Sequence, residues 1–172
     1  MTAVFAFLTL FLLLLLEGYS GNIGLPLPFF GVGVFYFVTI YRGIWLAMLM
    51  LMTGFLIDGL FMRPYPLTFL FFLALLILSH FWRKRGDLSS ATTQVFPGII
   101  IGILYILPYL PLMIPQEFFG MQLMDSLAFL ITYGAIGGIM LPVAVAGLDF
   151  FSEIIELKTY TGRNEDADER FR

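Results

Sequence analysis

Few residues in this chain have the type and spacing that chemistry requires, and Asp58 is the most informative of them. It is the one carboxylate well inside an apolar segment, in a run that begins at Gly54. An aspartate at the centre of a membrane helix costs roughly 2.5–3.5 kcal/mol, so such residues tend to have a function. Asp58 lies about four residues, or about 6 Å of rise, from the expected helix end, which lowers that cost. We expect it to pair with Arg63, to accept backbone N–H groups at the hairpin of residues 63–66, or to bind a substrate or partner.

The other polar side chains do not form a recognisable catalytic or metal-binding motif. His80 is the only histidine and the chain has no cysteine, so no zinc-type ligand set can be assembled from these residues. No Gly-x-Ser-x-Gly motif marks a nucleophile. An enzyme acting on lipid would need acid and base groups that converge at one depth, and none are visible. We therefore predict a protein that is not an enzyme and has no cofactor. We expect Asp149 only to reach the membrane interface.

The composition predicts an integral membrane protein. Of 172 residues, 60% are hydrophobic and 12% are charged, whereas about 25% of an ordinary soluble domain is charged. A soluble fold of this length could not cover so much apolar surface. The net charge of −3 gives no basic field for nucleic acid.

Six apolar segments are long enough to approach the ~20 residues that a membrane span needs. The first could instead be a cleaved signal peptide, but no Lys or Arg precedes its apolar core, so we favour a retained helix. We predict a six-helix transmembrane domain over residues 1–157 and a charged, disordered cytoplasmic tail over 158–172. The expected spans are 1–16, 25–41, 43–62, 65–82, from 89–94 to about 107, and 127–151.

The distribution of basic residues predicts the orientation. Lys and Arg concentrate in short cytoplasmic loops. With both termini in the cytoplasm, only Arg63 of the nine basic residues lies outside. The other eight are then internal: Arg42, Arg83, Lys84, Arg85, Lys158, Arg163, Arg170 and Arg172.

Two pairs of glycines have the spacing that lets membrane helices pack closely. Gly98 and Gly102 lie in the fifth expected span, and Gly134 and Gly138 lie in the sixth. Small residues four positions apart allow helix backbones to approach each other. Contacts within one bundle are the simpler interpretation, and contact with a partner's transmembrane helix is the alternative.

The stretch 25–85 resembles the rod shape-determining protein MreD family. It has a proline-led helix with Phe35-Tyr36-Phe37 near its end, then Tyr41-Arg42-Gly43. A helix with Gly54-x-x-x-Asp58, a proline hairpin, an apolar helix and a basic stop follow.

This resemblance implies a non-enzymatic scaffold in the bacterial inner membrane. It would belong to the cell-elongation complex, bind an MreC-like bitopic protein, and help couple MreB filaments to RodA and a penicillin-binding transpeptidase. The family is also similar in fold to the S-components of energy-coupling-factor transporters. The alternative function is therefore that of an S-component that binds a vitamin.

Overall fold

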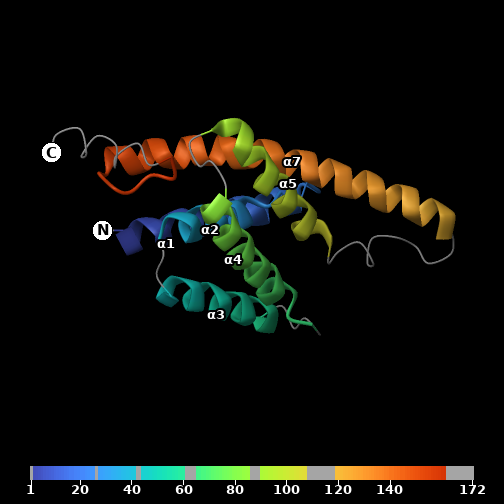
Figure 1. The fold of residues 1–172 in the computed structure, drawn as a ribbon. Helices are drawn as coiled ribbons and strands as arrows, with labels where there is room; N and C mark the ends of the chain where they lie inside the picture. Colours follow the sequence, from blue (N-terminus) through green and yellow to red (C-terminus); the bar gives the residue numbers. More distant parts are fainter. Residues whose placement is uncertain are drawn as a thin grey trace.

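The computed structural model describes residues 2–25, 27–41, 44–60, 65–85, 90–107 and 119–161, and within these ranges it contains helices and no strand. An all-helical fold was predicted, and the described residues confirm it. Figure 1 shows the arrangement of six helices. They are α1 (Thr2–Asn22), α2 (Phe29–Ile40), α3 (Ile44–Leu60), α4 (Leu67–Arg85), α5 (Ala91–Ile106) and α7 (Phe119–Ile154).

Three of these helices are long and apolar enough to cross a membrane: α1 over Ala3–Asn22, α4 over Leu67–Lys84 and α7 over Met124–Ile154. The other three are shorter, with 12 residues in α2, 17 in α3 and 16 in α5. A 12-residue helix rises only about 18 Å. By length and composition, therefore, three of the described helices could each cross a membrane.

Two predicted loops are partly helical, which corrects the expected boundaries. The first helix was expected to end before Glu17, but α1 continues to Asn22, and the Glu17 carboxylate accepts the N–H of Phe30 in α2. The last helix was expected to begin at Leu127, but α7 begins at Phe119. Residues 108–118 lie outside the described ranges.

The centre of the fold is α2, the shortest helix. It is apolar on every side, which is typical of a helix surrounded by protein or lipid. Every residue from Phe30 to Thr39 is buried, and Phe35, Tyr36 and Phe37 are completely so. It packs against α1, α4, α5 and α7.

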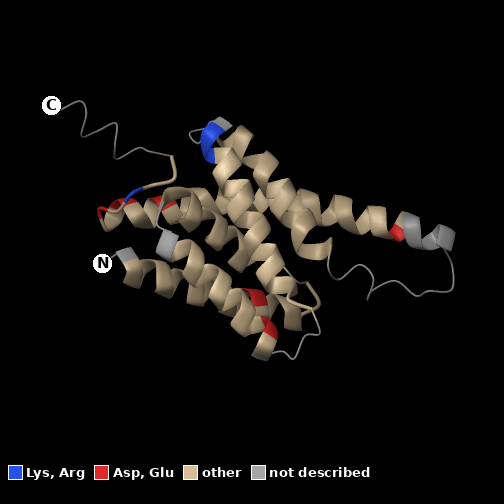
Figure 2. Ribbon diagram, turned by 60° about the horizontal axis from the view of Figure 1, so that its bottom comes forward, with Lys and Arg blue, Asp and Glu red and all other residues tan. Residues whose placement is uncertain are grey.

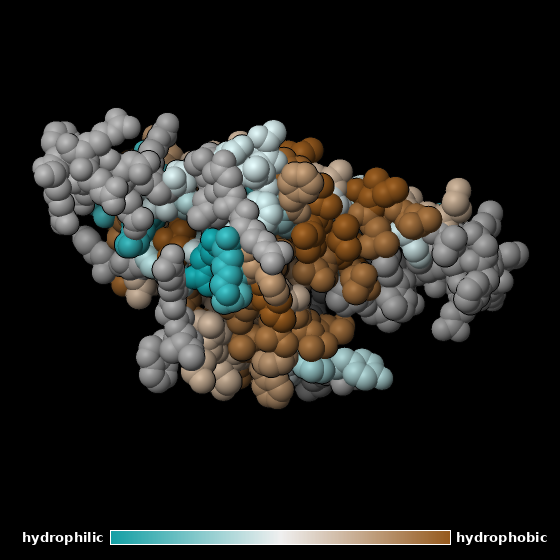
Figure 3. Space-filling view, in the orientation of Figure 1, coloured by the Kyte–Doolittle hydropathy of each residue, from teal (hydrophilic) through white to brown (hydrophobic). Residues whose placement is uncertain are grey.

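The periphery is apolar too. Side chains of α1 and α3 such as Phe7, Met52 and Phe55 are more than 60% exposed. Figure 3 shows hydrophobic residues over much of one face. Figure 2 shows the acidic and basic residues near helix ends, with long uncharged stretches between them. Such a surface suits lipid as the surrounding solvent.

The start of the predicted tail is packed, which corrects its boundary. Thr159 and Tyr160 are buried, with 7% and 2% of their surfaces exposed. Because residues 158–172 are mostly polar and charged, the sequence did not indicate that Tyr160, near the beginning of this segment, packs against Tyr36 of α2. Residues 162–172 lie outside the described ranges.

Candidate functional site

Asp58 lies near the end of α3 and caps the beginning of α4. Its carboxylate is 4% exposed and accepts hydrogen bonds from the backbone N–H groups of Thr68 and Phe69, each at 3.0 Å. The first N–H groups of a helix have no partner within that helix. The positive end of the helix dipole also favours a carboxylate at this place. Asp58 therefore joins α3 to α4 through both of its oxygens.

Gly54 brings the two helices close enough for this contact. A side chain at Gly54 would meet the backbone Cα of Phe69 at 3.1 Å and the ring of Phe72 at 2.9 Å. The residue is one turn before Asp58, so it faces the same first turn of α4. The Gly54–Asp58 pair thus serves the α3–α4 packing in this structure.

Arg63, the other predicted member of this site, lies outside the described residues. Of the expected roles for Asp58, acceptance of backbone N–H groups is the one visible here. The two N–H donors, Thr68 and Phe69, belong to the first turn of α4.

Glu17 makes a similar contact between α1 and α2, which the sequence analysis missed by placing it in a loop. Its Oε2 accepts the backbone N–H of Phe30, in the first turn of α2, at 2.8 Å. The Tyr105 side chain of α5 lies near this carboxylate. In two places, therefore, a carboxylate near the end of one helix caps the next helix along the chain.

Asp149, near the end of α7, is the second buried aspartate, and our expectation that it only reaches the membrane interface was wrong. It is 6% exposed. Its Oδ1 accepts the Tyr36 hydroxyl and the Tyr160 backbone N–H, both at 2.7 Å. Its Oδ2 accepts the backbone N–H of Thr161 at 3.1 Å and the hydroxyl of that residue at 2.9 Å. The four donors come from α2 and from the segment after α7.

The chain reverses direction after α7 in order to reach Asp149. The Leu157 N–H donates to the Ser152 carbonyl at 2.8 Å, and Glu156 adopts a left-handed conformation with φ of 57°. This is the pattern of a Schellman-type helix end, in which the left-handed residue is usually glycine. The turn brings Tyr160 into a stack with Tyr36, with ring centroids 5.9 Å apart and planes at 17°.

The Tyr160 hydroxyl lies in a region where some buried polar atoms make no hydrogen bond of ordinary geometry with the described residues. Its hydroxyl, the Thr159 hydroxyl and the indole N–H of Trp82 are buried without a hydrogen bond of ordinary geometry among the described residues. Burial raises the pKa of Tyr160, and the nearby negative charge of Asp149 raises it further, while the neighbouring Trp82 indole lowers it. Tyr160 is therefore held as the neutral phenol.

The predicted glycine pairs lie on opposite sides of one helix contact. A methyl group added at Gly98 would collide with the Gly137 carbonyl, and one at Gly102 would collide with the Tyr133 carbonyl. Gly134 and Gly138 face isoleucine side chains of α5, at 3.4 and 3.0 Å from an added methyl group. In the structure the two glycine pairs lie in the same α5–α7 contact within the chain. Gly137, which precedes Gly138 in the sequence, also belongs to this contact.

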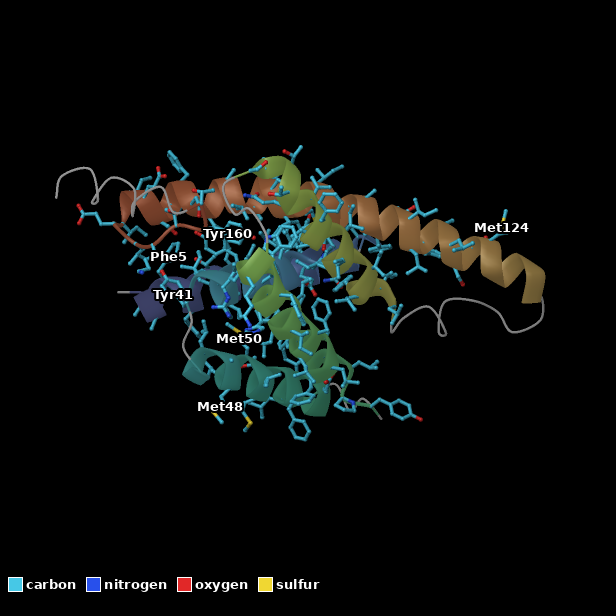
Figure 4. The ribbon with its side chains drawn as sticks, in the orientation of Figure 1. Phe5, Tyr41, Met48, Met50, Met124 and Tyr160 are labelled. Atoms are coloured by element: carbon cyan, nitrogen blue, oxygen red, sulfur yellow. The ribbon has the colours of Figure 1, made fainter. Side chains whose placement is uncertain are left out.

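The arrangement is suited to holding helices together. In the described part of the chain, no group of three or more histidine, aspartate or glutamate residues could hold a metal ion. Glu17, Asp58 and Asp149 each direct their oxygens at backbone or hydroxyl donors of this same chain. Figure 4 shows Tyr160, Phe5 and Tyr41 in one region of the molecule and Met124 at the far end of α7.

In comparisons with known proteins, the chain matches no protein-family model, no curated protein and no solved structure.

Proposed function

We propose that this protein is a non-enzymatic membrane scaffold that binds partner proteins through its helices. The observation that carries the proposal is the use of three carboxylates in the described residues. Asp58 and Asp149 are buried and Glu17 is partly buried, and each accepts hydrogen bonds within the chain. Much of the surface of the described helices is apolar.

The proposal includes six membrane spans with both termini in the cytoplasm. The three long helices supply spans by length alone. The shorter α2, α3 and α5 lie between them along the chain and pack against them, and α2 reaches full burial at the centre. Lys84 at the end of α4 and Lys158 after α7 agree with a cytoplasmic location of those ends.

The resemblance of residues 25–85 to the MreD family gives the proposal a biological setting. The protein would lie in the bacterial inner membrane as part of the cell-elongation complex. An MreC-like bitopic protein would be its direct partner, and RodA with a penicillin-binding transpeptidase would follow in the same assembly. The capping contact of Asp58 gives a structural reason for the Gly54-x-x-x-Asp58 pattern that the resemblance depends on.

Co-purification tests this function. The tagged full-length protein is extracted from membranes with and without a co-produced MreC-like partner, and the recovered species are quantified. A stoichiometric complex that survives purification is expected. A monomer that retains one small hydrophilic molecule per chain would contradict the scaffold and support the S-component alternative.

A further inference from the structure

The chain segment after α7 folds back over the end of that helix. We call residues 157–161 the strap, and in Figure 1 it is part of the red segment that turns back along the end of α7. Asp149 accepts the backbone N–H groups of Tyr160 and Thr161 and the hydroxyl of Thr161. The Tyr160 ring stacks on that of Tyr36. The strap therefore covers both the carboxylate of Asp149 and one face of the Tyr36 ring.

The strap is attached to α7 through a strained turn. Glu156, directly before the strap, is the only residue other than glycine with a positive φ in the described part of the chain. A side chain disfavours this left-handed conformation because its Cβ approaches the following carbonyl oxygen. Residues held in such conformations cluster at ligand clamps and switch regions. The turn that folds the strap back thus opposes its closed position.

Closing the strap also buries polar atoms without partners. Within the described ranges, the buried side-chain atoms that lack a hydrogen bond of ordinary geometry are Trp82 Nε1, Thr159 Oγ1 and Tyr160 Oη. Two of these atoms belong to the strap, and the Trp82 indole is a neighbour of the Tyr160 hydroxyl. Polar atoms buried in this way destabilise the state that buries them, and water can bind to them once they are exposed. All three atoms therefore favour an open strap.

The helices do not need the strap in order to stay packed. The central helix, α2, also packs against α1, α4 and α5. A comparison with Asp58 shows the difference: its donors begin α4, a helix of 19 residues, so they can leave only if this helix unwinds or separates from α3. The strap donors of Asp149 lie outside any helix, at the end of the described chain. The strap can therefore move alone.

We propose that the strap is a lid that opens while the six described helices stay packed. Opening makes the carboxylate of Asp149 and the hydroxyls of Tyr36 and Ser152 accessible to water. Ser152 lies three residues after Asp149 on the same face of α7, and its hydroxyl is 3.2 Å from that of Tyr36. The open form thus presents three polar groups together at the end of α7. The lid does not depend on the proposed scaffold function.

Cysteine labelling in detergent tests the lid, because the chain contains no cysteine of its own. Ser152→Cys places a thiol at a 1% exposed position beneath the strap. Val34→Cys is the matched control, since Val34 is 0% exposed and lies two residues from Tyr36, on the opposite side of α2. A water-soluble maleimide should label the thiol at position 152 about tenfold faster than the thiol at position 34. Equal rates would mean that the strap opens only when the whole chain unfolds, and the proposal would be wrong.

Two further substitutions, each combined with Ser152→Cys, connect the labelling to the strap. Glu156→Gly relieves the strain of the left-handed turn, so labelling at position 152 should become about threefold slower. Tyr160→Ala removes the ring that covers Tyr36, so labelling should become about tenfold faster. The same substitutions combined with Val34→Cys should leave labelling at position 34 unchanged. If neither substitution alters the rate at position 152, fraying of α7 exposes the thiol and the strap is not a lid.

Hydrogen exchange in the unmodified chain gives an answer even if the cysteine variants do not fold. The amides of Tyr160 and Thr161 should exchange about tenfold faster than those of Thr68 and Phe69, because opening of the strap exposes only the first pair. The two pairs are matched, since each donates to a buried aspartate. Equal protection of both pairs would refute the lid.

Discussion

Asp58 and Asp149 are two almost fully buried aspartates at opposite ends of the molecule, and they differ in where their partners come from. Asp58 accepts N–H groups that follow it by 10 and 11 positions. Asp149 accepts N–H groups 11 and 12 positions later, and also the hydroxyl of Tyr36, 113 positions earlier. The first carboxylate completes a local helix hairpin, and the second fastens the centre of the fold to the end of the described chain. The two aspartates are therefore similarly buried but connect different numbers of chain segments.

The largest effect is expected from Asp149→Ala. The substitution leaves the buried Tyr160 N–H without its acceptor and leaves the Tyr36 hydroxyl with only the Ser152 hydroxyl, at 3.2 Å. A buried donor left without an acceptor costs about 1–3 kcal/mol, and Asp149 accepts four hydrogen bonds. The free energy of unfolding in detergent micelles measures the loss. Tyr36→Phe removes only the hydroxyl that contacts Asp149 and Ser152, and it should cost less, about 2 kcal/mol. If Asp149→Ala is no more costly than Asp58→Ala, the distinction between the two ends does not hold.

The glycine contact between α5 and α7 lies between the two ends and should respond to size alone. Gly102→Ala places a methyl group against the Tyr133 carbonyl, and overpacking of this kind costs about 1–3 kcal/mol. Gly134→Ala is the control, because its methyl group meets isoleucine side chains at an ordinary 3.4 Å. Alanine also favours a helix by about 1 kcal/mol over glycine, so this variant should be neutral or more stable. Equal losses at both glycines, seen in thermal unfolding, would contradict this account of the contact.

Asp58→Ala should have a smaller effect, about 1–2 kcal/mol, as expected for loss of a helix cap. Asp58→Asn keeps an acceptor and should cost less. Partner recovery should remain nearly unchanged in both variants, because the carboxylate faces α4 and not the exposed surface. A large loss of complex from a variant that unfolds normally would mean that Asp58 takes part in binding.

The smallest effect concerns alkaline pH at the Asp149 end. Tyrosine ordinarily ionises near pH 10, and the pKa of Tyr160 is raised in the folded chain. The unfolded chain therefore loses this proton first, and stability falls as the pH rises above about 10. Tyr160→Phe should make that decline shallower, as followed by unfolding at several pH values. Tyr65→Phe, at a 68% exposed position, is the control for removal of a tyrosine hydroxyl from the surface.

The part of this structure that could be predicted from sequence is the part that depends on nearby residues. Helical segments follow from apolar runs of sufficient length, and glycines four positions apart indicate close packing. The position of Asp58 four residues before the expected helix end limits it to a short list of partners. One of these, the backbone N–H groups near the next helix start, is what the structure displays.

The remainder depends on contacts that a linear pattern does not reveal. Asp149 resembled an ordinary interfacial residue because its partners on α2 are more than a hundred positions away. Tyr160 was hidden in a charged segment, although its position 11 residues after Asp149 could have suggested a returning chain. Glu17 was assigned to a loop because polarity was taken to end the helix. Apolar residues on every helix face also gave no information about which helices are neighbours.

The long-range contact between Tyr36 and Asp149 has a consequence for how the protein is made. At a synthesis rate of about 5–20 residues per second, Tyr36 is made roughly 6–23 s before Asp149. During that interval α2 already needs burial, but its hydroxyl acceptor and its stacking partner have not been translated. The helices α1, α4 and α5, which also pack against α2, are all translated before α7. The contacts of the central helix are therefore complete only after the last described helix has been made.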